Sequence, residues 1–219
     1  CFKRVSLPLG QQTVFIKSED QAGNVLSEEV TLFIDDKAPR IHKQEPLRGI
    51  TNGLFTLTYT EEQSVPQINL YYKETSASTY QQVLVSGCSQ GRRQVCNKEV
   101  NLETLHGQNI SYYFSVSDIL STTIGRVQYL QVDTQDPSLT LLSPNVTSFT
   151  SNFIDLTLNS NEKVTFTYSD NGGSFVKLCS NCYSYNRRKR FNDGPHNLLL
   201  KATDIAGNSN TTNVSFTIL

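Results

Sequence analysis

The sequence contains no methionine or tryptophan, and its 219 residues carry a formal net charge of only −1 at pH 7. Such a balance gives no electrostatic preference for nucleic acid or for an anionic membrane surface. No apolar run approaches the roughly 18 residues that a membrane span needs. Because no amphipathic helical pattern exceeds about two turns, a helical bundle is not expected either.

Short segments rich in Val, Ile, Phe, Tyr and Thr fill most of the chain, and Asn-Gly, Gly-Gly or Asp-Gly pairs separate them. Apolar and polar residues alternate within these segments, which is typical of antiparallel strands with one buried face. In the last third of the chain the pattern predicts separate strands over residues 153–158, 164–168 and 175–178. Because each buried face needs a facing sheet, we expect an all-β fold with two stacked sheets in each unit.

Three aspartates mark corresponding points of a repeat, namely Asp20, Asp118 and Asp204. They lie 98 and 86 residues apart, and a unit of roughly 85–100 residues is the size of an immunoglobulin-like sandwich. Arrays of such small β-domains usually act as spacers, display other parts of a protein, or adhere to a surface. The sequence shows no nucleophile–base pair, paired-carboxylate cleft or phosphate loop, so we assign no catalytic residue and no enzyme activity.

A linker with two prolines recurs at the same spacing: Asp35, Pro39 and Pro46 correspond to Asp133, Pro137 and Pro144. Proline fixes φ and has no amide donor, so each linker ends one strand and stiffens the entry to the next domain. The markers predict tandem immunoglobulin-like β-sandwiches, the first one incomplete. Residues 1–37 are the C-terminal half of one domain, and residues 38–135 and 136–219 are two complete domains.

The first unit retains only two strands, over residues 13–17 and 30–34, and such a remnant cannot bury a core of its own. Either the sequence is a fragment of a longer chain, or a neighbouring chain completes this sandwich by donor-strand pairing. We favour the fragment.

Four of the five cysteines are expected to form disulfides within their own units. Cys96 and Cys182 each lie 22 residues before the aspartate that marks their unit. The expected bonds are Cys88–Cys96 and Cys179–Cys182, the second in a turn between strands, with Cys1 left as half of a further pair. A redox or zinc site at Cys179-x-x-Cys182 is the alternative, but redox motifs need a helix N-terminus and zinc needs four ligands. Disulfides indicate an oxidising, extracellular-type compartment.

Residues 193–208, DGPHNLLLKATDIAGN, resemble the penultimate hairpin of bacterial and archaeal immunoglobulin-like repeats in large cell-surface proteins. The pattern of those repeats is G-x-H-x-L-x3-A-x-D-x-A-G-N. The match is close in the third unit, good in the first, and weak in the second, where residues 119–121 read Ile-Leu-Ser. The resemblance implies surface display, adhesion or assembly, without catalysis.

Calcium is an alternative role for the aspartates near the two expected junctions. They are Asp20, Asp35 and Asp36 at the first, and Asp118, Asp133 and Asp136 at the second. Calcium takes six to eight oxygen ligands, and the fuller acidic motifs of cadherin linkers are absent. The ordinary interpretation is structural, because Asp bonds turn amides while Gly and Asn tolerate positive φ. We therefore expect no bound cofactor.

The densest charge run is Arg187, Arg188, Lys189 and Arg190. We interpret it as a solvated loop, with a furin-like cleavage site, a polyanion contact or a contact patch for a partner as alternatives. N-x-S/T sequons make four glycosylation candidates, a number that chance alone explains: Asn109, Asn145, Asn210 and Asn213.

Together these features predict an extracellular structural or adhesive segment of a multidomain surface protein or filament. The expected partners are other protein domains, copies of the chain in a surface filament, or a glycan or other cell-surface ligand. Nucleic acid and a membrane span in this segment are not expected. The alternatives are a filament protomer completed by donor-strand pairing and an accessory immunoglobulin-like segment of a secreted enzyme.

Overall fold

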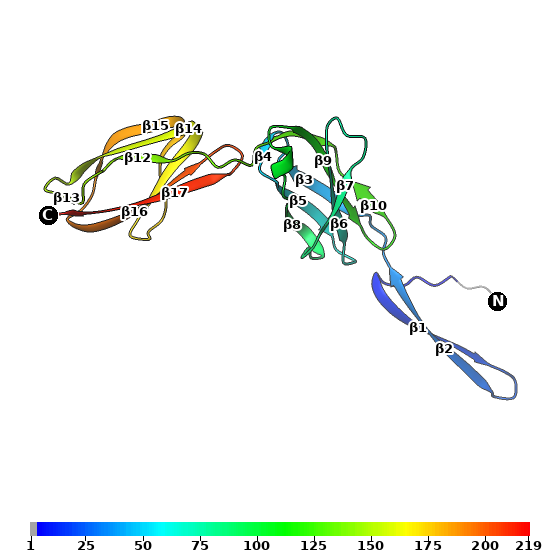
Figure 1. Ribbon diagram of the computed structural model, residues 1–219. Helices are drawn as coiled ribbons and strands as arrows, with labels where there is room; N and C mark the ends of the chain where they lie inside the picture. Colours follow the sequence, from blue (N-terminus) through cyan, green and yellow to red (C-terminus); the bar gives the residue numbers. More distant parts are fainter. Residues whose placement is uncertain (1–3) are drawn as a thin grey trace. The chain divides into compact units, whose positions relative to one another are not determined.

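The computed structural model describes residues 4–219, and nearly all of its regular structure is β-strand (Figure 1). Cys1, expected as half of a disulfide, lies outside the described residues. The chain divides into two compact units. One holds the residues up to Gly49 with Leu54–Val100 and Asn109–Leu130, and the other holds Ile50–Gly53, Asn101–Gln108 and Gln131–Leu219. Within the described part, no helix is both long and apolar enough to cross a membrane.

The first two strands form a two-stranded sheet, which we call the N-terminal hairpin. Strands β1 (Gly10–Glu19) and β2 (Val25–Ile34) pair antiparallel with each other over their full lengths. Apolar side chains of the hairpin stay in solvent, and Phe15 and Leu26 are 71% and 73% exposed. This agrees with the expectation that two strands alone cannot bury a core.

The strands that follow form two sheets, which we call the central sandwich. One sheet has the order β3-β5-β8 and the other β4-β11-β9-β6-β7, with β10 paired to β9. The bounds are β3 (Arg40–Glu45), β4 (Gly49–Thr51), β5 (Leu54–Glu61), β6 (Gln67–Glu74), β7 (Gln81–Val85), β8 (Gly91–Glu99), the short 3-10 helix η1 (Glu103–Leu105), β9 (Asn109–Ser117), β10 (Thr122–Ile124) and β11 (Gln128–Val132).

Period-two alternation produces the core between these two sheets. Along β5, Phe55, Leu57 and Tyr59 are fully buried and the threonines between them face outward. On β9, Tyr112 and Phe114 are also fully buried, and the rings of Phe55 and Tyr112 meet with centroids 4.7 Å apart. The predicted pair of facing sheets is therefore present here, because only stacked inner faces remove these rings from water.

The remaining strands form the C-terminal sandwich, whose sheet has the order β12-β14-β16-β17-β13, with β15 paired to β14. The bounds are β12 (Thr140–Ser143), β13 (Ser148–Phe149), β14 (Phe153–Asp170), β15 (Val176–Arg190), β16 (Gly194–Thr203) and β17 (Ser209–Ile218). Residues from the first half of β14 and from β16 and β17 share one buried core, including Leu156, Leu198 and Phe216. The sheet therefore folds over itself and encloses its own apolar face.

The separate strands predicted over residues 153–158 and 164–168 are wrong in one respect, because β14 runs through both. Its pairing with β15 shifts register between Asn159 and Val164. The first half pairs with β12 and the second half with β16. The polar residues 159–163 break the alternation in the sequence, but the backbone stays extended there while it exchanges one partner strand for another.

Candidate functional site

The three repeat aspartates each organise the turn that follows them. Asp20 Oδ1 accepts the amide hydrogens of Ala22 and Asn24, both at 2.9 Å. Asp204 Oδ1 does the same for Gly207 at 2.7 Å and Asn208 at 2.9 Å. In both turns the asparagine side chain donates to the second carboxylate oxygen at 2.8 Å. The structural interpretation of Asp-x-Ala-Gly-Asn therefore holds in detail.

Asp118 plays the same role although its turn lacks the Ala-Gly-Asn sequence. Its Oδ1 accepts the amides of Leu120 and Ser121, and the Ser121 hydroxyl donates to Oδ2 at 2.9 Å. Ser121 thus replaces the asparagine of the other two turns. Partial burial acts to raise the pKa of Asp118, but these hydrogen bonds outweigh it and hold the pKa below its usual value.

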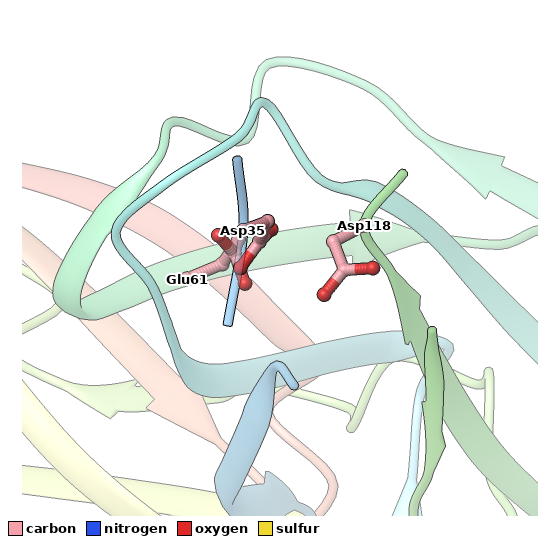
Figure 2. A group of neighbouring side chains, drawn as sticks. All are labelled: Asp35, Glu61 and Asp118. Atoms are coloured by element: carbon pink, nitrogen blue, oxygen red, sulfur yellow. The ribbon is translucent and has the colours of Figure 1, made fainter. Parts of the chain in front are cut away.

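Asp118 also belongs to a cluster of three carboxylates, the first acidic cluster, with Asp35 and Glu61. One ligand oxygen of each residue lies within 4.8 Å of the others. Figure 2 shows the carboxylates of Asp35 and Glu61 close together, with Asp118 beside them. The three residues come from three places in the chain: the residue after β2, the end of β5 and the residue after β9.

Glu61 is the least exposed member of this cluster, at 2%. It continues the inward-facing series of β5, and its Oε1 accepts the amides of Gln63 at 2.8 Å and Ser64 at 2.9 Å. In contrast, the Oδ2 atom of Asp35 is buried and has no hydrogen-bond partner among the described residues. A buried carboxylate oxygen without a donor is costly, and a cation is one group that would satisfy it.

An equivalent group, the second acidic cluster, contains Asp133, Glu162 and Asp204. Its ligand oxygens also lie within 4.8 Å of one another. Burial raises the pKa of Glu162, and the negative charges of Asp204 and Asp133 raise it further. Repulsion of this kind is what a bound cation would remove.

The two clusters correct the expected grouping of junction aspartates. Asp20 and Asp35 cannot share a site, because the hairpin register places them at opposite ends of ten-residue strands, about 30 Å apart. Asp118 and Asp133 lie at opposite ends of β9, since Asp118 follows that strand while Val132 bonds Gln108 just before it. Neither Asp36 nor Asp136 belongs to either cluster.

Sequence reasoning missed the glutamates of both clusters, although one signal was present. Glu61 falls in phase with the buried positions Phe55, Leu57 and Tyr59. A carboxylate at a core position of an alternating strand is unusual unless it is paired or coordinated. Glu162 gave no such signal, because it lies in the polar stretch that interrupts the alternation of β14.

The residues of both clusters fit a hard divalent cation such as calcium in charge and ligand type. Each offers three carboxylates, and calcium binds six to eight oxygens, including backbone carbonyls and water. In the first cluster both aspartate side chains are held by their own turn or linker: Asp118 Oδ1 accepts turn amides, and Asp35 Oδ1 accepts the Lys37 amide at 3.1 Å. Their orientation is therefore fixed before any cation binds.

Both short-range disulfides are present in the structure. Cys88 and Cys96 are joined with an S–S distance of 2.00 Å, and Cys179 and Cys182 with 1.94 Å. The expected turn around Cys179 is wrong, because both cysteines lie within β15. A local irregularity accommodates them: Asn181 has φ of 57°, and the pairing with β14 shifts register there.

The basic run 187–190 also lies in β15 rather than in the expected solvated loop. Successive side chains of a strand point to opposite faces, so its four charges do not form one patch. Arg188 Nε bonds Asp155 Oδ1 at 3.1 Å, and Lys189 Nζ lies 5.5 Å from the ring centre of Tyr168. The four sequon asparagines are exposed: Asn109, Asn145, Asn210 and Asn213.

No family model matches this sequence. No curated protein matches it either. Three solved structures align with much of the chain. The fibronectin(III)-like modules of Clostridium thermocellum CbhA share 13% identity at a TM-score of 0.43, covering 83% of this chain and 94% of that chain.

The tetra-tandem repeat in the extending region of a large adhesion protein shares 18% identity at a TM-score of 0.38, covering 95% of this chain and 56% of that chain. The chicken CNTN1 FN1–FN3 domains share 10% identity at a TM-score of 0.46, covering 95% of this chain and 76% of that chain. With every TM-score below 0.5, these alignments carry no argument about activity or partners. The strands and buried cores described above are what define the chain as tandem immunoglobulin-like β-sandwiches.

Proposed function

We propose that this chain is a non-catalytic segment of an extracellular protein, in which tandem sandwiches space or display adhesive parts. The observation that carries the proposal is the repetition of one design. The central and C-terminal sandwiches each contain one short-range disulfide and one cluster of three carboxylates, two of which are the linker aspartate and the turn aspartate that recur in the repeat. Repetition of one unit suits mechanical display better than catalysis.

The compartment follows from the disulfides, because such bonds persist in oxidising environments and are rare in the cytosol. Among the partners we propose are other protein domains, further copies of the chain and cell-surface glycans. The filament alternative requires a neighbouring chain on the exposed face of the N-terminal hairpin. The accessory-segment alternative requires a catalytic domain elsewhere in the same protein.

Surface labelling of intact cells tests this function. An antibody against the folded segment is expected to bind unpermeabilised cells, and brief treatment with external protease is expected to abolish the signal. Peptide mapping of the native protein without reduction should recover Cys88 linked to Cys96. The proposal is wrong if labelling requires permeabilised cells and the native protein carries free thiols at these positions.

A second proposal is that a divalent cation stiffens the segment at the two acidic clusters. The buried, unpartnered Oδ2 of Asp35 favours it at the first cluster, and the raised pKa of Glu162 favours it at the second. When bound, the cation would supply positive charge that offsets the repulsion among the carboxylates. The protein's own contribution is to fix the carboxylates through turn amides.

Calorimetric titration with calcium separates the two sites. The unmodified chain is expected to bind two ions, and Glu61→Gln and Glu162→Gln are each expected to bind one. The control is Glu29→Gln on the exposed hairpin, which should still bind two. Equal uptake by all four proteins, or none by any, would contradict the cation proposal and leave the surface-labelling result unaffected.

A further inference from the structure

Three strands of the central sandwich bring basic side chains together on their outer face. Arg40 of β3 pairs in register with Thr60 of β5, so the two side chains share that face. His42 Nε2 lies 2.8 Å from Thr60 Oγ1, and the Arg93 amide of β8 donates to the same oxygen at 2.9 Å. We call Arg40, His42, Arg92 and Arg93 the basic cluster.

Local distortions of both flanking strands place these residues. The β3–β5 pairing shifts register between Ile41 and Lys43, at His42. The β5–β8 pairing shifts between Tyr59 and Glu61, and Arg93 there adopts a φ of 50°. A bulge re-aims side chains and is often found next to functional positions. A positive φ at a non-glycine residue is strained and persists only where surrounding contacts hold it.

The arginines of the cluster are not neutralised by ion pairs: over residues 4–219, Arg40, Arg92 and Arg93 form none. Glu62 lines the same surface depression as Arg40 but does not pair with it. Desolvation and then the positive charges of Arg40, Arg93 and Arg92 lower the pKa of His42. The cluster is therefore a site of like-charge repulsion that a bound anion would relieve.

We propose that the basic cluster binds an anionic polysaccharide through its repeated carboxylate or sulfate groups. Arginine presents planar paired donors that match such groups. The side chains lie on an open sheet face, which suits an extended polymer better than a small enclosed ligand. The choice of polysaccharide over nucleic acid rests on the proposed extracellular function.

Binding of defined polymers at low and moderate salt tests the proposal. Dextran sulfate and polygalacturonate supply sulfate and carboxylate separately, neutral dextran is the uncharged control, and duplex DNA represents the other class of polyanion. We expect either anionic glycan to bind, neutral dextran not to bind, and DNA to bind more weakly. Equal or tighter binding of DNA would overturn the assignment to polysaccharide.

Variants locate the binding. Arg40→Gln with Arg92→Gln removes two charges from the cluster and should weaken glycan binding about tenfold, since each exposed charge pair changes affinity by up to about fivefold. The matched control removes two exposed arginines of β15, Arg187→Gln with Arg190→Gln, and should change affinity less than about twofold. Equal loss in both pairs would mean that net charge, not this cluster, binds the polymer.

The imidazole of His42 reports occupancy directly. With three histidines in the chain, its resonance can be followed through a pH titration by NMR. Glycan is expected to raise the pKa of His42, because the anion offsets the arginine charges around it. Arg40→Lys with Arg92→Lys keeps the charge but loses the paired donors, so its affinity should lie between those of the unmodified chain and the glutamine variant. Binding without any change at His42 would refute the site, whereas surface labelling would be unaffected by either result.

Discussion

Replacing Asp170 with asparagine should destabilise the C-terminal sandwich in acid far more than in base. Asp170 Oδ2 lies 2.7 Å from His196 Nδ1, and Nε2 of the same ring lies 2.8 Å from the carbonyl oxygen of Asn192. A carboxylate and a carbonyl can only accept hydrogen bonds, so both ring nitrogens carry hydrogen and His196 is an imidazolium. The histidine is 9% exposed and packs against the rings of Phe191 and Phe216.

The pH range follows from the direction of the pKa shift. Burial acts to lower the pKa of His196, but the Asn192 carbonyl and the Asp170 carboxylate outweigh it and raise the pKa above 6.5. A raised folded-state pKa contributes stability that is complete below the unfolded value and is lost as pH rises through the folded value. The ion pair should therefore contribute most near pH 5.5 and little at pH 8.5.

The magnitude depends on how buried the pair is. Breaking a fully buried ion pair by removing one partner costs about 3–5 kcal/mol. The side chain of Asp170 is 28% exposed, and the asparagine retains the shape and an acceptor. We therefore expect about 2 kcal/mol at pH 5.5 and under about 1 kcal/mol at pH 8.5.

Native-state hydrogen exchange measures this loss in the right part of the molecule. The amides of Leu198 and Leu200, on the buried strand β16, report the opening free energy of the C-terminal sandwich alone. Asp155→Asn is the control, because its partner Arg188 is 73% exposed and the pair should contribute under about 0.5 kcal/mol at either pH. An equal loss at both pH values, or a larger loss at pH 8.5, would refute the imidazolium assignment.

Two further perturbations test the central sandwich. Gln44→Ala should lower the free energy of unfolding by about 2 kcal/mol in urea titration, because it leaves a buried amide unpaired. Gln44 is 4% exposed, and it accepts from the Phe114 amide at 2.9 Å and donates to the Arg126 carbonyl at 2.8 Å; an unchanged midpoint would contradict this role. Replacing Cys88 and Cys96 together with alanine should lower stability by about 2.5 kcal/mol, the entropy of closing a short loop, and calorimetry should show a lower Tm for this sandwich only.

Sequence reasoning predicted the strands well where alternation was uninterrupted. In β5 the inward residues are the ones that the period-two pattern selects, because a one-residue slip would expose every one of them. It failed in β14 and β15, where polar residues and a disulfide interrupt the alternation but the backbone remains extended. Alternation reports which face is buried, whereas hydrogen bonding to partner strands decides whether a segment is a strand.

The candidate sites were harder to predict, because strand direction rather than sequence distance decides which residues meet. Asp118 lies 15 residues before Asp133 in the sequence, yet it joins Asp35. In the same way, the basic cluster joins Arg40 to Arg93 around Thr60 of β5, through the register with β3 and the hydrogen bond from the Arg93 amide. Neither grouping can be read from charge runs, and the densest run, in β15, is divided between two faces of its strand.

The structural order of the two acidic clusters should not depend equally on a bound cation. At the second cluster, Asn208 Nδ2 donates to the backbone oxygen of Asp133 at 2.9 Å as well as to Asp204 Oδ2. The side chain of Asn208 therefore holds the linker at Asp133 against the turn at Asp204, through hydrogen bonds that persist without any ion. At the first cluster Ser121 occupies the corresponding position, and its shorter side chain donates only to Asp118. The weak match of the second repeat to Ala-Gly-Asn thus has a physical consequence. Calcium should order the first acidic cluster more than the second, because the first lacks the equivalent hydrogen bond to the linker and Asp35 Oδ2 has no donor among the described residues.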